Sequence, residues 1–139
     1  MKYILTHKKI TGAIKIEYDN HNRIRSFEFD CEVSDDLWKF LMGNVPVTYE
    51  SLSHPDFKNF NVNPLPEDIS FKAFWDAYGY KVGNKSRTEK LFNLLSEMER
   101  TCAIVSIKAY NQFLVKHPQQ EKCYPETYLN QKRFENDFK

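Results

Sequence analysis

The residues best suited to binding chemistry are closely spaced cations in the second half of the sequence. Four cations fall within ten residues, with Glu89 as their one acidic neighbour. They are Lys81, Lys85, Arg87 and Lys90. Such a group is typical of a patch that binds phosphates or an acidic protein surface, and the alternative is the solvated start of a helix. Because the positive end of a helix dipole disfavours cations, local stability does not explain Lys85 and Arg87 at a helix start.

Two further cations lie near the C-terminal end of the chain. Lys132 and Arg133 would extend the patch if the helices that carry them pack side by side. We therefore expect these six cations to form a binding site for a protein or nucleoprotein partner. Contact with an RNA or DNA backbone through the basic turn is part of this expectation, although the net charge of only +1 argues against a dedicated DNA-binding protein.

An aromatic stripe precedes the cations. Its members follow one another at spacings of three and four, which predicts one face of a helix. They are Phe71, Phe74, Trp75 and Tyr78. The simplest interpretation is core, because aromatic side chains bury large areas. The alternative is a stacking or docking surface.

Catalytic chemistry finds little support. The four histidines and three cysteines show no local spacing of metal ligands or of a nucleophile with its base. Asp35 and Asp36 fit the first turn of a helix better than an acidic pair, and no acidic cluster suggests a nuclease. Residues 79–86 lack the spacing of a phosphate-binding loop. We expect no enzymatic activity, no metal and no cofactor.

The composition is that of a globular protein of one domain, or one small domain with an appendage. The chain has 139 residues, of which 41% are hydrophobic and 28% charged. No apolar run approaches the ~20 residues of a membrane span, and no signal peptide is visible. Three widely spaced cysteines favour reduced thiols, which predicts a cytosolic compartment. Residues 1–69 hold 8 Lys/Arg against 11 Asp/Glu, whereas residues 70–139 hold 12 against 8.

The first third of the chain predicts a small sheet and one helix. Residues 2–6, 12–18 and 23–31 read as strands, and the turn at 19–22 indicates an antiparallel β-meander of three strands. A helix from Ser34, a good N-cap, to about Gly43 would cover one face. The expected contacts between sheet and helix involve Ile14, Ile16, Phe27, Phe29, Trp38 and Leu41.

The rest of the chain predicts a linker and a helical module. Residues 53–69 read as a Pro-containing linker, which gives domains 1–52 and 70–139. Helices are expected at about 70–79, 85–95, 96–115 and 125–136, with a capping box at the start of the third. The inward positions expected are Leu91, Leu94, Leu95, Cys102, Val105, Ala109, Tyr110, Phe113, Tyr128, Leu129 and Phe134. The fold class is therefore α+β: a β-meander with one helix, then a four-helix unit.

Residues 71–136 also resemble the C-terminal region of phage and prophage replication-accessory proteins. The resemblance rests on Phe71-Lys-Ala-Phe-Trp-Asp-Ala-Tyr78, on the Lys/Gly turn at 81–85, and on Pro125-Glu-Thr-Tyr-Leu-Asn-Gln-Lys-Arg-Phe-Glu135. Family members usually carry a helix-turn-helix domain before this region, whereas this chain has a β-meander there. The resemblance implies an origin in a phage or mobile element, a helical interaction module and, as its location, the cytoplasm of a bacterial host cell.

The expected function is therefore binding. As the resemblance implies, the protein would be an accessory protein in phage DNA replication that contacts a helicase or primosome. The alternative is a phage-encoded inhibitor of host defence, of the anti-CRISPR type, that binds a nucleic-acid-guided effector or its RNA.

Overall fold

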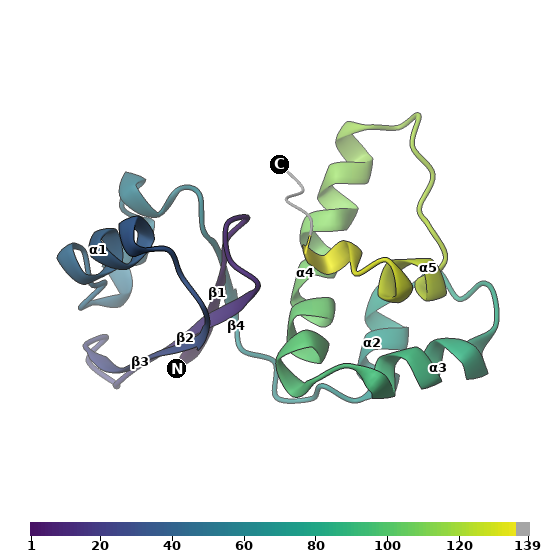
Figure 1. Ribbon diagram of the computed structural model, residues 1–139, viewed down its shortest axis with the longest axis horizontal. Coiled ribbons are helices and arrows are strands. Elements are labelled where there is room, and N and C mark those ends of the chain that lie inside the picture. The colour runs from purple at the N-terminus through teal and green to yellow at the C-terminus, as the bar shows by residue number, and fades with distance from the viewer. Residues whose placement is uncertain (136–139) are drawn as a thin grey trace. The chain divides into compact units, whose positions relative to one another are not determined.

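The computed structural model describes residues 1–135 and confirms the α+β fold class (Figure 1). The chain divides into two compact units, Met1–Leu65 and Pro66–Lys139, which are considered separately below. Within the described residues, no helix has both the length and the apolar character needed to cross a membrane.

The first unit is built on a four-stranded antiparallel sheet. Its strands are β1 (Lys2–Thr6), β2 (Gly12–Tyr18), β3 (Ile24–Cys31) and β4 (Asn61–Pro64), in the order β3-β2-β1-β4. The turn between β2 and β3 is held by the Asp19 carboxylate, which accepts hydrogen bonds from the backbone N–H groups of His21 (2.8 Å) and Arg23 (3.0 Å). The three predicted strands are therefore confirmed.

The fourth strand corrects the sequence-based prediction. Residues 53–69 were expected to be an irregular linker, yet β4 lies within them and pairs with β1, with Leu5 opposite Val62. A four-residue strand with two asparagines, one proline and one β-branched residue has little strand propensity of its own. Its pairing partner lies at the other end of the unit, so no local pattern could reveal it.

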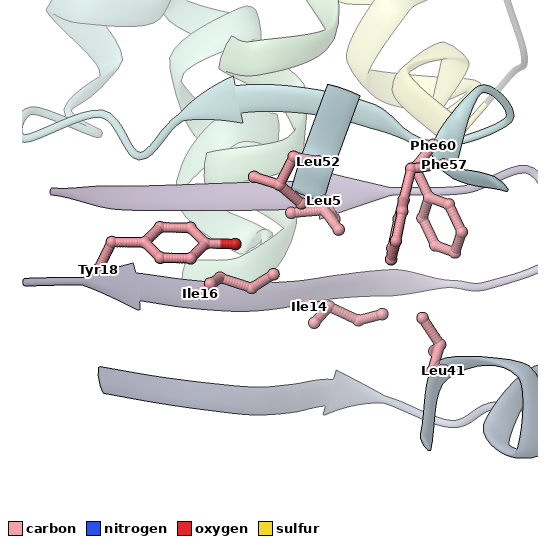
Figure 2. Close-up of a cluster of buried hydrophobic side chains, with 8 residues drawn as sticks. All are labelled: Leu5, Ile14, Ile16, Tyr18, Leu41, Leu52, Phe57 and Phe60. Carbon is pink, nitrogen blue, oxygen red and sulfur yellow. The ribbon is translucent and has the colours of Figure 1, made fainter. Parts of the chain in front are cut away.

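A hydrophobic core covers one face of this sheet (Figure 2). The sheet contributes Leu5, Ile14, Ile16 and Tyr18, and the chain between β3 and β4 contributes Leu41, Leu52, Phe57 and Phe60. Leu41 belongs to α1 (Asp35–Gly43), where the Ser34 hydroxyl accepts a hydrogen bond from the Leu37 N–H (3.2 Å) as expected of an N-cap.

The expected core contact of Trp38 is wrong. Its side chain is 50% exposed. The core face of α1 is formed by Leu37, Phe40 and Leu41, at spacings of three and four. Trp38 follows Leu37 directly and is therefore rotated away from that face.

The described part of the second unit contains four α-helices, as predicted. They are α2 (Phe71–Tyr78), α3 (Lys85–Leu94), α4 (Glu97–Lys116) and α5 (Pro125–Asn130). The expected capping box at the start of α4 is present: the Ser96 hydroxyl accepts from the Glu99 N–H, and the Glu99 carboxylate accepts from the Ser96 N–H.

Stacked aromatic rings form the centre of this helical unit. Phe74 of α2 and Tyr110 of α4 both stack on Tyr128 of α5, with ring centroids 5.9 and 5.8 Å apart. All three side chains are almost fully buried. The Tyr128 hydroxyl donates to the Ala103 carbonyl at 2.8 Å, so this buried polar group is satisfied.

Two details of the helical unit differ from the prediction. Leu94 was expected inside but is 82% exposed, and Phe92 occupies the core instead at 1% exposure. The last helix ends at Asn130, because the chain turns through Lys132 (φ 48°) into a short 3₁₀ helix, Arg133–Glu135. Residue 136, the expected helix end, lies outside the described residues.

Candidate functional site

An open groove of about 630 Å³ lies on the helical unit. Three elements line it: α2, α3 and the beginning of α4, together with Lys81 from the connection between α2 and α3. Both apolar and charged residues line it, among them Phe71, Trp75 and Lys85. We take this groove as the candidate functional site.

The floor of the groove is aromatic. The Phe71 ring lies 5.6 Å from Trp75 and 5.9 Å from Phe92, between centroids. Phe71 is half-buried, whereas Trp75 is only 8% exposed. The aromatic stripe predicted from the sequence is thus divided: Phe74 and Tyr78 belong to the core, and Phe71 and Trp75 reach the groove.

Lys85 lies over this floor. Its ammonium nitrogen is 5.6 Å from the centre of the Trp75 ring, which is a cation–π contact. Lys85 is the first residue of α3, next to the Asn84 N-cap, so it sits at the positive end of the helix dipole. Among the described residues, no carboxylate or carbonyl forms an ion pair or hydrogen bond with its ammonium group.

The other three cations of the groove have partners. Lys72 and Lys81 both bind the Asp76 carboxylate, at 2.8 and 3.0 Å. Their hydrogen bonds lower the pKa of Asp76 to about 2, so this carboxylate is ionised at neutral pH. The Arg100 guanidinium donates to the carbonyls of Phe92 (3.3 Å) and Asn93 (2.8 Å), at the C-terminal end of α3.

The remaining predicted site residues lie outside the lining of the groove. Arg87 pairs with Glu126 of α5 at 3.2 Å, and Lys132 pairs with Glu99 of α4 at 2.9 Å. Arg133 donates to the Gln131 side chain, and Lys90 is exposed on α3. The structure therefore brings together Lys81 and Lys85 of the six. A binding role for the other four stays a prediction.

Sequence reasoning missed several residues of the groove. Lys72 and Asp76 are spaced as an i,i+4 ion pair on a helix, a signal that could have placed them on one face. Arg100 showed no such pattern, because it belongs to α4 and its hydrogen-bond partners are backbone carbonyls of α3. Glu89 was noted only as a neutralising charge, although its side chain lines the groove.

A second polar cluster holds the segment 117–124 against α2 and α4. The Lys122 ammonium donates to the Tyr78 carbonyl (2.6 Å) and to the Asn111 side chain (2.8 Å), and lies 4.4 Å from the centre of the Tyr78 ring. The Tyr78 hydroxyl donates to the Cys123 carbonyl at 2.6 Å. Burial raises the pKa of Tyr78 and lowers the pKa of Lys122. These contacts pair partly buried polar groups with one another and point to a structural role.

Metal chemistry finds no support in the part of the chain that the structure describes. Among residues 1–135, no group of three His, Cys, Asp or Glu side chains could hold a metal ion.

The geometry thus defines a helical unit with an aromatic groove, in whose described lining Lys85 is a cation without an anionic partner. Residues 66–132 of this unit match the family described as the Legionella vir region protein LvrA C-terminal domain. The match covers just under half of the chain and begins at Pro66, where the helical unit begins. No curated protein and no solved structure matches the chain.

This match overturns the resemblance to phage replication-accessory proteins, because it assigns the same region to a different family. The aromatic residues of the motifs behind that resemblance lie mainly in the core. Phe74, Tyr78 and Tyr128 pack against one another at the centre of the unit. Such spacings report how aromatic helices pack, so they are a poor guide to function.

Proposed function

We propose that the protein is a small non-enzymatic accessory protein, and that its helical unit binds a protein or nucleoprotein partner at the groove. The observation that carries this proposal is Lys85, whose ammonium group lies over the Trp75 ring without an anionic partner. An anionic group of the partner would form an ion pair with this ammonium group.

The placement of Lys85 supports a role in binding over a role in stability. At the first position of α3 a cation opposes the helix dipole, which costs a few tenths of a kcal/mol. Glu89, one turn further along α3, lines the same groove without pairing with Lys85. The charge of the second half of the chain, with 12 Lys/Arg against 8 Asp/Glu, also favours an anionic partner.

The proposal does not include phage DNA replication, because that expectation came from the resemblance now corrected. Inhibition of host defence, by binding a nucleic-acid-guided effector or its RNA, stays a prediction, and no contact or charge described above favours it specifically.

The experiment is affinity capture from the native host with three baits: wild type, Lys85→Glu and Lys108→Glu. The two variants carry the same charge change in the same unit, but Lys108 is exposed on α4 outside the groove and belongs to no predicted site. We expect partner recovery to fall with Lys85→Glu and to persist with Lys108→Glu, at unchanged melting temperatures. Equal recovery with all three baits would remove the groove from the proposed function.

A further inference from the structure

We infer that the groove takes a peptide segment of a partner protein, in which an Asp or Glu carboxylate lies beside a large apolar side chain. This inference rests on the proposed function, and it names the chemical class of the partner's binding segment.

The charges that line the groove are suited to binding a single carboxylate of the partner. Of the four cations in its lining, Lys72 and Lys81 are neutralised by Asp76, and Arg100 is directed at backbone carbonyls of α3. Lys85 therefore supplies one position for an anionic group. A single Asp or Glu side chain would accept hydrogen bonds from its ammonium group, as in other charge-assisted contacts.

The acidic residues of the groove argue against a nucleic-acid strand. Asp76 and Glu89 line the groove together with Lys85. A strand carries a negative charge at every phosphate, so it would bring several anions near these carboxylates. A peptide avoids this repulsion, because neutral or basic residues can flank its one carboxylate.

The floor of the groove fits an apolar side chain better than a stacked base. Trp75 is 8% exposed, and the Lys85 ammonium lies over its ring. Binding of bases to single-strand proteins depends on aromatic faces that are open for stacking. Phe71 is half-buried and adjoins Trp75 and Phe92, so it offers an apolar surface beside Lys85. The volume of about 630 Å³ lies in the usual range of ligand pockets, about 300–1,000 Å³.

The chain offers a direct reporter for this site. It has two tryptophans, and Trp38 is half exposed in the other unit, so Trp38→Phe leaves Trp75 as the only indole. Random peptides displayed on a surface are selected against this variant. One enriched peptide is then synthesised, together with forms in which its acidic residue becomes Gln or its apolar residue becomes Ser. Single-stranded RNA is titrated in parallel, and all binding is followed by Trp75 fluorescence.

We expect enrichment of peptides with an acidic residue next to a large apolar one. Binding should weaken roughly tenfold when the acidic residue becomes Gln, and by a similar factor with Lys85→Gln, because both changes remove the same ion pair. Lys108→Gln is the matched control, because Lys108 is exposed on α4 outside the groove lining, and it should leave binding unchanged. Loss of the apolar residue should weaken binding as well.

Two results would overturn the inference, and they differ in what they mean for the proposed function. If RNA binds with Lys85-dependent affinity while the selected peptides do not, the partner segment is a nucleic acid and the binding role of the groove stands. If neither RNA nor any selected peptide shows binding that depends on Lys85, both the inference and the proposed function of the groove fail.

Discussion

At the scale of single residues, Trp75 links the groove to the helical core. It is 8% exposed, and its ring lies 5.6 Å from that of Phe71. We expect Trp75→Ala to lower the free energy of unfolding by roughly 3–5 kcal/mol, because it removes a large buried ring and leaves a cavity. Equilibrium unfolding in urea measures this change.

The control for this prediction is Trp38→Ala. Trp38 is 50% exposed, so its replacement should change the stability by no more than about 1 kcal/mol. Equal effects of the two substitutions would show that Trp75 is a surface residue and that the aromatic floor contributes nothing to folding.

Tyr18 gives a prediction on pH. Burial, with smaller effects of nearby groups, raises the pKa of Tyr18 from 10.0 to about 12, and its hydroxyl donates to the Pro46 carbonyl at 2.9 Å. Between these two pH values the unfolded chain loses the proton that the folded chain keeps. The stabilisation from Tyr18 is therefore complete below pH 10 and is lost as the pH rises toward 12.

The matched variant is Tyr18→Phe, which cannot titrate. It should be about 1 kcal/mol less stable than wild type at neutral pH, since it lacks the hydrogen bond. Unfolding in urea, repeated from neutral to alkaline pH, should show this difference shrinking above pH 10. A constant difference over the whole range would contradict the assigned cause.

Individual residues were predictable where a single helical face decides their burial. Tyr128 and Leu129 of α5 are buried as such a face predicts. Phe134 is buried as expected too, although it lies in the 3₁₀ helix beyond the turn at Lys132. The prediction that Leu94 is buried is wrong, because the buried face of α3 is that of Thr88 and Phe92. A residue two positions beyond Phe92 lies on the opposite side of the helix. The position of Lys85 over Trp75 depends on how two helices pack, so the sequence showed the cation and the ring but not their contact.

At the scale of elements, the segment 117–124 has no regular structure and depends on side-chain contacts for its position. Lys122 provides two of them, to the Tyr78 carbonyl and the Asn111 side chain. We expect Lys122→Met to cost about 1–2 kcal/mol, because it leaves two partly buried acceptors without their donor. Thermal unfolding measures the loss.

Lys108→Met is the matched control, since Lys108 is exposed on α4. It should stay within about 0.5 kcal/mol of wild type. A Lys122→Met protein as stable as this control would mean that the cluster does not hold the segment. Amide hydrogen exchange in residues 117–124 provides a second, local measurement.

Elements were predictable where their signals are local. The starts of α1, α2 and α4 follow from Ser34, Ser70 and Ser96, each of which accepts a hydrogen bond from a backbone N–H three residues later. Strand β4 carries no comparable signal, because its hydrogen bonds to β1 connect opposite ends of the first unit. The groove was equally hidden, since three elements must meet before it exists.

At the scale of the whole molecule, the boundary at residues 65–66 predicts how the chain can be divided. The first unit has its own core. Its sheet is completed by β4, and directly after this strand the Leu65 N–H donates a hydrogen bond to the Lys2 carbonyl. We expect a fragment of residues 1–68 to be soluble and folded. Circular dichroism should show strand content and a cooperative thermal transition.

A shorter fragment, residues 1–58, provides the contrast. It lacks β4 and also Phe60, which is 7% exposed in the core. It should show no cooperative transition, because β1 loses one of its two neighbours and the core loses a large ring. If residues 1–68 behave like this shorter fragment, the first unit does not fold alone and the boundary does not mark an independent domain.

The pairing of β1 with β4 also has a consequence for how the protein folds during synthesis. β1, β2 and β3 follow one another closely and can pair soon after they leave the ribosome. The other edge of β1 stays open until residues 61–64 have emerged, because its partner is the last strand of the unit. During that interval β1 presents unpaired N–H and C=O groups, the feature that makes open strands prone to wrong pairing. The closing of this long loop is therefore the step that we expect to set the folding rate of the first unit.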